Sequence, residues 1–350
     1  MSGPLRLALI GAGSIAQAQL TNLARFDDVE VVACADPDER ALARARDTHG
    51  IARGYRDWRE LLESEELDAI SVCTPNAHHA EPSIAALRRG LHVLVEKPMA
   101  MQVAEALEMS RAARDAGAHL VVGFQFRFDP RTEAIRRQIE AGNLGRILHV
   151  RCQALRRRGI PNRGVFGRKE LTGGGPLIDI GVHVLELAHW LMGSPRPIAA
   201  SGAAWTYLGD QPMAAQCKWP DWDWRTYTVE DLAVGLIRFN DGSTLAIETS
   251  FAAHIARDVW NVHLLGSEGG ATWDTATIHR DANGTMWDEV CAHPGERHVY
   301  AHKLRHFVDV CRGRSPNQSP PEHGVLIQAM LDALYRSAAS GREVRLDGVG

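Results

Sequence analysis

Short apolar runs alternate with amphipathic segments over the first 124 residues of the chain. The apolar runs cover residues 5–10, 29–35, 69–73, 93–95 and 120–122. Helical spacing of apolar positions lies between them, for example over residues 38–49 and 103–116. Nearly continuous apolar strands joined by amphipathic helices are typical of a parallel sheet that is covered on both faces. The pattern therefore predicts a doubly wound α/β domain over residues 1–124.

After residue 124 this alternation stops, and strand patterns dominate. A helix is expected over residues 130–141, followed by strands over 146–155, 199–205, 231–239, 244–250 and 259–265. Residues 240–242, Asn-Asp-Gly, are a hairpin signal between two of these strands. Residues 125–350 are expected to form an α+β domain with a large, mostly antiparallel, open-faced sheet. Its last helices, expected over 302–311 and 323–339, are predicted to pack back on the body of the protein.

The first predicted strand runs directly into a glycine-rich turn of the form GxGxxA, from Gly11 to Ala16. Gly11 permits the tight turn, Gly13 lets the backbone approach a pyrophosphate, and the small Ala16 lets the next helix pack closely. The helix that starts at Ser14 and Ile15 offers free N–H groups and the positive end of its dipole to phosphates. With a strand before it and a helix after it, this turn predicts a dinucleotide site.

Asp36, at the end of the second predicted strand, sets the expected cofactor preference. Its carboxylate is expected to accept hydrogen bonds from the adenosine ribose hydroxyls and to repel a 2′-phosphate, which favours NAD over NADP. Arg40 lies one turn into the next helix, where a guanidinium can tolerate that phosphate. NAD is therefore the preferred cofactor, and NADP stays an alternative.

Residues 74–76 and 96–98 directly follow two further expected strands. In folds of this kind, ligands bind at the edge of the sheet where such strands end. Lys97 is expected beside the nicotinamide half of a bound cofactor. A lysine there can hydrogen-bond a substrate oxygen and favour its deprotonated form, and the alternative is a surface lysine before a turn. Pro98 restricts Lys97 to extended conformations, and a proline peptide bond can be cis.

Three glycines and a proline, residues 173–176, precede an apolar helix expected over 176–191. Pro176 suits a first helical position, and the glycines allow the backbone to come near a ligand. Asp179 and His183 are four residues apart, so they share one helix face near its N-terminus. A carboxylate beside an imidazole fixes its tautomer and stabilises its charged form, as a general base requires. A purely structural pair is the alternative.

Charge and composition argue against a nucleic-acid-binding, a membrane or a secreted protein. The formal net charge of −4 gives no electrostatic reason for binding nucleic acid or anionic lipid. No uncharged apolar run approaches the roughly 20 residues of a membrane span, and a first strand that begins by Leu5 leaves no room for a signal peptide. The six cysteines are scattered without a CxxC pair, which suits a reducing compartment. A cytoplasmic protein is expected.

No metal site is predicted from the histidines. His183 and His189 lie about 240° apart on an ideal helix, so Glu186 between them does not complete a ligand set. His302 and His306 share a helix face, but no HExxH motif accompanies them.

These residues together resemble the Gfo/Idh/MocA family, which includes glucose–fructose oxidoreductases and inositol dehydrogenases. The matching stretches, in the family's order, are GAGSIA from Gly11, Asp36, TPNAHH from Thr74, GLHVLVEKP from Gly90 and GGGPLIDIGVH from Gly173. The resemblance implies a Rossmann domain and an α/β domain whose open sheet often forms the subunit interface, hence a homo-oligomer, dimer or tetramer. It also implies hydride exchange between NAD(P) and a secondary hydroxyl of a sugar, cyclic polyol or glycoside.

The resemblance also assigns roles residue by residue. Lys97, Asp179 and His183 match the family's catalytic trio, in which His183 removes the hydroxyl proton as hydride passes to nicotinamide. Asp179 then orients His183, and Lys97 holds the reacting oxygen. The residues expected to bind the cofactor are Gly11, Gly13, Ser14, Ile15, Asp36, Arg40, Thr74, Pro75, Asn76, His79, Glu96, Lys97 and Gln125. Arg127 is expected near the substrate cleft; Glu186 and Leu91 depart from the family's frequent aspartate and lysine.

Two clusters outside these motifs have more than one interpretation. The tryptophan-rich stretch 218–224 places Trp222 and Trp224 beside acids, which suits stacking on a sugar ring; a loop anchored by buried indoles, or a subunit contact, is the alternative. Residues 156–158 are three consecutive arginines, with Arg163 and Arg168 nearby. They are interpreted as a solvated strand end, and recognition of an acidic substituent is the alternative.

Two other functions stay open beside the dehydrogenase. A glycosidase that uses tightly held NAD for transient oxidation would give net hydrolysis without accumulating NADH. A non-catalytic dinucleotide-binding sensor has no need of a proton-transfer pair, so the presence of Lys97, Asp179 and His183 together argues against it.

Overall fold

The computed structural model describes residues 3–162, 164–212, 215–217, 219–346 and 348. The chain divides into two compact units, and each of them combines two stretches that are distant in sequence. The first unit is Met1–Gln125 with His298–Val325, and the second is Phe126–Arg297 with Leu326–Gly350.

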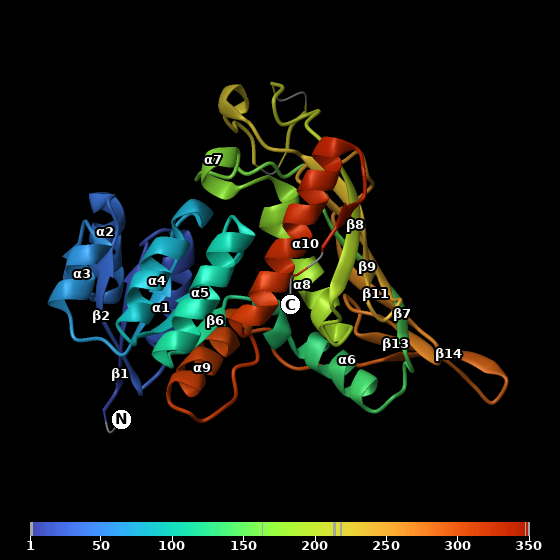
Figure 1. The fold of residues 1–350 in the computed structure, drawn as a ribbon, viewed down its shortest axis with the longest axis horizontal. Coiled ribbons are helices and arrows are strands. Elements are labelled where there is room, and N and C mark those ends of the chain that lie inside the picture. The colour runs from blue at the N-terminus through green and yellow to red at the C-terminus, as the bar shows by residue number, and fades with distance from the viewer. Residues whose placement is uncertain (1–2, 163, 213–214, 218, 347, 349–350) are drawn as a thin grey trace. The chain divides into compact units, whose positions relative to one another are not determined.

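A parallel sheet, six-stranded over the described residues, forms the centre of the first unit (Figure 1). Its strand order is β3-β2-β1-β4-β5-β6, so the order reverses between β1 and β4, where folds of this kind bind ligands. The strands are β1 (Leu5–Ile10), β2 (Val29–Ala35), β3 (Arg53–Tyr55), β4 (Ala69–Val72), β5 (His92–Val95) and β6 (Leu120–Val122). The helices are α1 (Ser14–Leu23), α2 (Glu39–His49), α3 (Trp58–Ser64), η1 (Asn76–His78), α4 (Ala80–Arg88), α5 (Val103–Ala116) and α9 (Val299–Cys311).

The doubly wound α/β prediction is confirmed, and the five strands expected from apolar runs are all present. The sequence pattern missed β3. This strand has three residues that are exposed or half-buried, and it pairs only with β2 at the sheet edge. An edge strand without a buried face needs no apolar run, so its sequence carries no strand signal.

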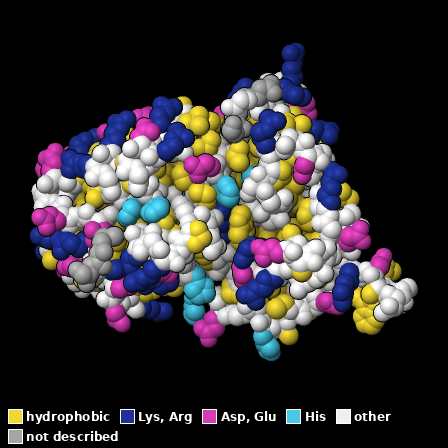
Figure 2. Space-filling view, turned by 60° about the horizontal axis from the view of Figure 1, so that its bottom comes forward, with side chains coloured by type: hydrophobic (Ala, Val, Ile, Leu, Met, Phe, Trp, Pro, Cys, Tyr) yellow, Lys and Arg dark blue, Asp and Glu magenta, His cyan; other side chains and the backbone are white. Residues whose placement is uncertain are grey.

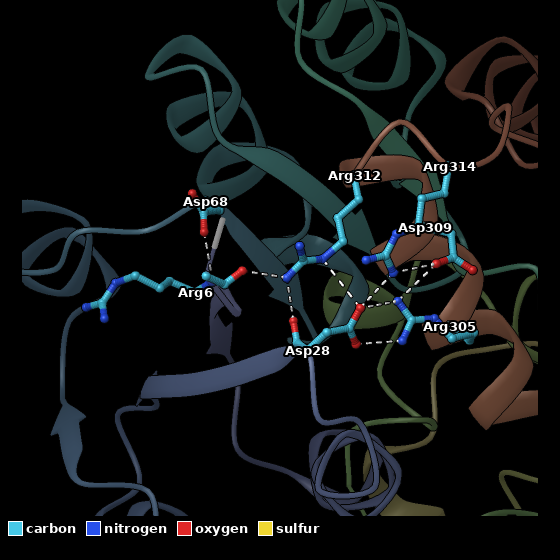
Figure 3. Close-up of polar contacts among 8 residues, drawn as sticks. Arg6, Asp28, Asp68, Arg305, Asp309, Arg312 and Arg314 are labelled. Atoms are coloured by element: carbon cyan, nitrogen blue, oxygen red, sulfur yellow. Dashed lines mark hydrogen bonds and ion pairs between the residues drawn. The ribbon is translucent and has the colours of Figure 1, made fainter. Parts of the chain in front are cut away.

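Helix α9 belongs to the first unit, and Asp28 holds it there (Figure 3). Arg305 donates from both Nη atoms to the Asp28 carboxylate at 2.7 and 3.1 Å, and Arg314 Nη1 donates at 2.8 Å. Arg312 Nη2 donates to the Asp28 carbonyl oxygen at 2.7 Å. The hydrogen bond from Arg305 lowers the pKa of Asp28 well below its usual range, although partial burial acts in the opposite direction. Phe307 on the same helix is fully buried in the core cluster that contains β1 and α1 side chains.

A mixed, mostly antiparallel sheet forms the second unit, as predicted, with nine strands in the part that the structure describes. The strand order is β14-β13-β12-β11-β7-β10-β9-β8-β15, and the neighbours β7 and β10 are parallel. The strands are β7 (Ile147–Leu155), β8 (Pro197–Trp205), β9 (Leu232–Phe239), β10 (Thr244–Ser250), β11 (Val259–Gly266), β12 (Gly269–Thr272), β13 (Thr277–Ala282), β14 (Thr285–Val290) and β15 (Val344–Arg345). The other elements are α6 (Pro130–Glu140), α7 (Lys169–Thr172), η3 (Leu177–Gly181), α8 (Val182–Leu191) and η4 (Trp224–Thr226). Two helices, η2 (Gln125–Phe128) and α10 (Pro321–Ser340), each contain one of the three unit boundaries.

Helices cover one face of this sheet. Element η3 packs on β7 and β10, and α8 packs on β7, β10 and β11. Gly235 on β9 leaves room for Leu334 of α10, because a Cβ atom at residue 235 would lie 2.3 Å from Leu334 Cδ2. Alternate residues of β10 are buried and half-exposed, which is expected when the opposite face of the sheet stays open. None of the helices described is both long enough and apolar enough to cross a membrane.

The strands β12 to β15 were not expected from the sequence, and β14 shows why. All six of its residues are exposed, so no alternation of buried and exposed positions marks it as a strand. Met286 is 86% exposed, and Trp287 and Val290 are also largely exposed. The β13–β14 hairpin projects beyond the rest of its sheet in Figure 1, and hydrophobic side chains gather on that projecting end in Figure 2. The unit therefore presents an exposed apolar surface on this hairpin.

Candidate active site

The glycine loop of the first unit crosses the end of β4 closely. Gly11 has a φ of 94°, and a Cβ atom there would lie 2.7 Å from the carbonyl carbon and oxygen of Cys73. Only glycine tolerates both conditions. Gly13 is exposed and has open space around it, and α1 begins directly after it without a side-chain cap. The first N–H groups of α1, from Ser14 onward, are therefore available to an anion.

Asp36 ties this loop to the end of β2. Its Oδ2 accepts a hydrogen bond from the Ala12 N–H at 2.7 Å, and its Oδ1 accepts one from the Asp38 N–H at 2.8 Å. Each carboxylate oxygen keeps further acceptor capacity, so Asp36 is also able to accept a ribose hydroxyl. Arg40 lies in the first turn of α2 with an exposed side chain.

His79 joins two of the loops that follow the sheet strands. Its ring is buried, with Nε2 2.9 Å from the Thr74 carbonyl oxygen and Nδ1 2.8 Å from the Pro98 carbonyl oxygen. Burial lowers the pKa of His79. Because both ring nitrogens contact backbone carbonyls, the side chain links the two loops. Pro75 and Asn76 lie between them at the start of η1.

Glu96 is buried beside β4 and β5, next to Lys97 in sequence. The ammonium of Lys303, on α9 and fully buried, forms an ion pair with Glu96 Oε1. Gln19 Nε2 donates to the same oxygen at 2.7 Å, and Ser71 Oγ donates to Gln19 Oε1 at 2.7 Å. Burial alone would raise the pKa of Glu96, but the charge of Lys303 and the hydrogen bonds from Lys303 and Gln19 lower it. The Lys97–Pro98 peptide bond is cis.

Sequence reasoning missed Lys303, although a signal for it exists. Tyr300, Lys303, Leu304 and Phe307 follow the spacing of the buried face of α9, so the lysine stands at a position that normally holds an apolar residue. A lysine on such a face requires a buried partner. That partner, Glu96, is 207 residues away in the chain and has no separate signal.

Gln125 has a buried side-chain oxygen that bears on whether the first unit fits a dinucleotide. The side chain is buried, and within the described residues its Oε1 has no hydrogen-bond partner. A buried carbonyl oxygen without a donor is costly unless a ligand supplies one. Together with the open space at Gly13 and the acceptor oxygens of Asp36, this orphaned atom fits a group that carries phosphates, hydroxyls and an amide.

In the second unit, the three glycines before Pro176 meet protein rather than open space. Gly173 ends α7 with a φ of 83°. A Cβ atom at Gly174 would lie 2.1 Å from Tyr335 Oη, and one at Gly175 would lie 2.0 Å from the Glu230 carbonyl oxygen. The close approach predicted from these glycines is thus an approach to the unit's own Glu230 and Tyr335.

Glu230 holds the turn that leads into the helix of Asp179 and His183. Its Oε2 accepts from the Gly175 N–H at 2.8 Å, and its Oε1 accepts from the Leu177 N–H at 3.1 Å. Tyr335 Oη donates to Oε1 at 2.8 Å. Burial raises the pKa of Glu230, and these three donors oppose that effect. N–H groups at the start of a helix have no acceptor within the helix, and the Glu230 carboxyl group accepts hydrogen bonds from two N–H groups there, those of Gly175 and Leu177.

The helix predicted over residues 176–191 is present, but its first part is a π-helix. Leu177–Gly181 is π-helical and contains Asp179, and α8 starts at Val182 and contains His183. Gly181 packs against Thr249 of β10, since a Cβ atom there would lie 2.6 Å from Thr249 Cγ2. A wider turn of this kind inside a helix is frequent at functional sites.

His183 is 9% exposed and lies among aromatic rings. Its ring centroid lies 5.2 Å from that of Phe126 and 6.3 Å from that of Trp260 on β11. Asp179 is half-buried, and its charge acts on both Arg156 and Tyr335. The second unit therefore brings Asp179, His183 and Arg156 to the helix-covered face of its sheet.

Arg127, expected near the substrate cleft, has a buried side chain. Its Nε donates to Glu186 Oε1, and both side chains are 1% exposed. Burial raises the pKa of Glu186, and the Arg127 charge opposes this. His189 on the next turn hydrogen-bonds the Pro195 carbonyl oxygen at 2.8 Å, and burial lowers its pKa to about 4. All three residues are buried, and Glu186 supplies the counter-charge that the buried Arg127 requires.

The tryptophan-rich loop is described apart from Lys218, which lies outside the described residues. Trp222 Nε1 donates to the Gly209 carbonyl oxygen at 2.8 Å, and the Arg225 guanidinium lies 4.3 Å from the Trp224 ring centroid. A hollow of about 350 Å³ is lined by residues 221–225. Trp222 is thus anchored to its own loop, and binding of a sugar by Trp222 and Trp224 stays a prediction. No group of three metal-ligating side chains is found among the residues described.

The Glu230 carboxyl group gives this site a specific dependence of stability on pH. Its raised pKa means that the folded protein holds the proton more tightly than the unfolded chain, so its contribution is present below the usual carboxyl pKa and is lost as pH rises through the raised value. Glu230→Gln stays neutral at every pH and removes this dependence. We expect the wild-type minus variant unfolding free energy, measured by urea titrations, to fall as pH rises from below the usual carboxyl pKa through the raised value. A difference that stays constant over this range contradicts the assignment.

Comparison with protein-family models matches both parts of the chain. Residues 5–124 match the Gfo/Idh/MocA oxidoreductase family with an NAD-binding Rossmann fold. Residues 132–272 match the Gfo/Idh/MocA C-terminal domain.

Individual relatives match over almost their full length. A D-glucoside 3-dehydrogenase of Escherichia coli (strain K12) is 36% identical over 347 residues, which is 99% of this chain and 98% of the relative. A myo-inositol 2-dehydrogenase of Thermotoga maritima is 26% identical over 352 residues, which is 99% of this chain and 99% of the relative. Among solved structures, GenD2 from gentamicin A biosynthesis in complex with NAD superposes with a TM-score of 0.81 at 26% identity, covering 99% of this chain and 98% of that one.

Proposed function

The chain belongs to the Gfo/Idh/MocA family of NAD-binding oxidoreductases, and from that premise we propose that it is a dehydrogenase that oxidises a secondary hydroxyl of a pyranoside, sugar or cyclic polyol. One observation carries this proposal: Asp179 and His183 stand on a π-helix and the α-helix that continues it, with His183 framed by aromatic rings. The D-glucoside and myo-inositol dehydrogenases among the relatives support a carbohydrate or polyol substrate.

The first unit is an NAD-binding Rossmann domain, and its residues fit that cofactor. NAD⁺ supplies the hydride acceptor when it is bound. We propose that the N-terminus of α1 binds the pyrophosphate, that Asp36 accepts the ribose hydroxyls, and that Gln125 uses its orphaned oxygen toward the cofactor. The remaining cofactor residues in this proposal are Gly11, Gly13, Ile15, Arg40, Thr74, Pro75, Asn76, His79, Glu96 and Lys97.

Three side chains carry the proposed proton chemistry. His183 accepts the proton of the reacting hydroxyl, because a neutral imidazole is the side chain best matched to this task near neutral pH. Asp179 orients that imidazole and stabilises its charged form. Lys97 donates a hydrogen bond to the reacting oxygen and stabilises the negative charge that develops on it.

We also propose that the chain forms a homo-oligomer, a dimer or a tetramer, through the open face of its second sheet. The exposed apolar side chains on β14 and the half-exposed residues on β10 support a surface of this kind. In this proposal residues 1–124 bind the dinucleotide and residues 125–350 bind the substrate and the partner subunit. A cytoplasmic location remains part of the same proposal.

Screening for NADH formation tests the proposed activity. We expect purified protein with NAD⁺ to produce NADH from methyl glucopyranosides, aldoses or myo-inositol, and to use NADP⁺ less well because of Asp36. Absorbance of NADH gives the initial rates. Cleavage of a glycoside without accumulating NADH would instead identify the NAD-using glycosidase. Binding of NAD without either reaction on the whole panel would favour the sensor and contradict the dehydrogenase.

A further inference from the structure

Arg156 is not the solvated strand end that the sequence suggested. Its N–H donates to the Ser250 carbonyl oxygen at 2.9 Å, and its carbonyl oxygen accepts from the Ala253 N–H at 2.8 Å, so β-type pairing continues past the end of β7. Alternate residues of a strand share a face, and Cys152 and Ala154 are buried under the helices. Arg156 therefore continues the face of β7 that η3 and α8 cover.

The Arg156 guanidinium is half-buried against aromatic rings. Its Cζ lies 4.8 Å from the Trp219 ring centroid and 5.4 Å from the Phe251 ring centroid. Its one side-chain hydrogen bond among the described residues goes from Nη1 to the Gly159 carbonyl oxygen at 2.9 Å. A guanidinium carries five N–H donors, so most of them remain for a ligand.

The carboxylates that act on this guanidinium are Asp179 and Asp258. Burial lowers the pKa of Arg156, and the charges of these two carboxylates oppose that effect. Asp258 already accepts from the Arg157 N–H at 2.7 Å. The opposite charges of Arg156 and Asp179 therefore act on each other, and η3, which carries Asp179, packs on the strand that leads to Arg156.

The neighbouring arginines are used differently. Arg157 is exposed, and its Nη1 donates to the Ala256 carbonyl oxygen at 3.0 Å. Arg158 donates from Nη1 to the carbonyl oxygens of Arg157 and Ala253. These two side chains fasten the loop after β7, whereas Arg156 stacks on indole and phenyl rings.

We propose that Arg156 is a substrate-binding residue that holds two neighbouring hydroxyl oxygens of a neutral pyranoside beside Asp179. A vicinal diol accepts hydrogen bonds from the guanidinium and donates them to a carboxylate, so it matches both groups. A carboxylate or phosphate on the substrate would pair with Arg156 but would be repelled by Asp179. This assignment rests on the proposed dehydrogenase activity, and it adds the substrate class and the residue that selects it.

Kinetics of Arg156→Gln test the assignment, with Arg157→Gln as the matched control. The probes are methyl β-D-glucopyranoside and D-glucuronate, each with NAD⁺, and the readouts are kcat, KM and the Kd for NAD. We expect Arg156→Gln to lower kcat/KM for the glucoside by about 10- to 100-fold, mainly through KM, because charge-assisted hydrogen bonds are lost. The Kd for NAD should not change, and Arg157→Gln should behave as wild type.

The other outcomes are equally decisive. Wild-type kcat/KM for the glucoside in Arg156→Gln overturns the assignment and leaves the dehydrogenase proposal intact. A wild-type preference for D-glucuronate that disappears in Arg156→Gln overturns the neutral diol in favour of an anion. If Arg156→Gln does not fold, Arg156→Lys, which keeps the charge without the planar fork, must show the same rise in KM.

A failure of the proposed activity is detected separately. If the wild type reduces NAD⁺ with neither probe, thermal shifts with each probe in the presence of NADH decide the binding claim. A shift with the glucoside in the wild type that Arg156→Gln loses supports Arg156 as a binding residue without the dehydrogenase. The absence of any shift in the wild type overturns both proposals.

Discussion

His183→Ala is expected to lower turnover by on the order of 10²-fold or more while the affinity for NAD stays unchanged. The reason is that the substitution removes the proposed proton acceptor from the second unit and leaves the glycine loop, Asp36 and Gln125 of the first unit untouched. Initial rates of NADH formation, with fluorescence titration of NADH binding, measure the two effects separately.

His189→Gln is the matched control for this prediction. His189 stands on the same helix, and a glutamine amide can replace its hydrogen bond to the Pro195 carbonyl oxygen. This histidine is already neutral at physiological pH, since burial lowers its pKa to about 4. We expect His189→Gln to keep turnover within a few-fold of wild type. Equal turnover in His183→Ala and wild type would remove His183 from the mechanism.

Lys303→Met is expected to cost about 3–5 kcal/mol of unfolding free energy in the first unit. Lys303 is fully buried, and its ammonium is the counter-charge of the buried Glu96 carboxylate. Removing one partner leaves the other charge in a site of low polarity without compensation. Urea unfolding followed by circular dichroism, together with amide hydrogen exchange in α9 peptides, measures the loss.

A double variant separates the charge from the packing. In Lys303→Met with Glu96→Gln both groups are neutral, and we expect most of the lost stability to return. Arg305→Met, which removes a partly exposed arginine from the same helix, should cost no more than about 1 kcal/mol, since Arg312 and Arg314 still contact Asp28. An equal loss of unfolding free energy in Lys303→Met and Arg305→Met would show that the buried ion pair contributes no more to stability than the partly exposed one.

The ion pair also fixes the sign of a pH effect. The pKa of Glu96 is lowered in the folded protein, so its contribution to stability is present above the usual carboxyl pKa and is lost as pH falls through the lowered value. Glu230 has the opposite sign because its pKa is raised. The first unit is therefore expected to lose stability in acid through Glu96, while Glu230 favours the second unit there.

Local patterns in the sequence were sufficient for the regular parts of both units. The apolar runs predicted β1, β2 and β4 to β6, and the predicted helix over 103–116 has the bounds of α5. These elements are buried on at least one side, so the spacing of their apolar residues follows the buried face. The strands β3 and β14 were not predicted, because a strand without a buried face has no periodic spacing of apolar residues.

The candidate site was predictable only where a local motif marks it. The turn at Gly11 and the pair Asp179–His183 are visible because their geometry is set by residues close together in the chain. Arg127 shows the limit: no local pattern predicts its hydrogen bond to Glu186, a carboxylate 59 residues away in the chain.

The sequence by itself determined the family, the glycine-rich turn after the first strand and the order of the strands along the chain, because each of these depends on neighbouring residues. Only the tertiary structure decided which groups contact the charged side chains inside each unit. Lys303 with Glu96, Glu230 with the glycine turn, and Arg156 with its aromatic rings are contacts between distant segments. Such contacts arise because a buried charge takes whatever partner the fold brings within reach, and no local pattern encodes that partner.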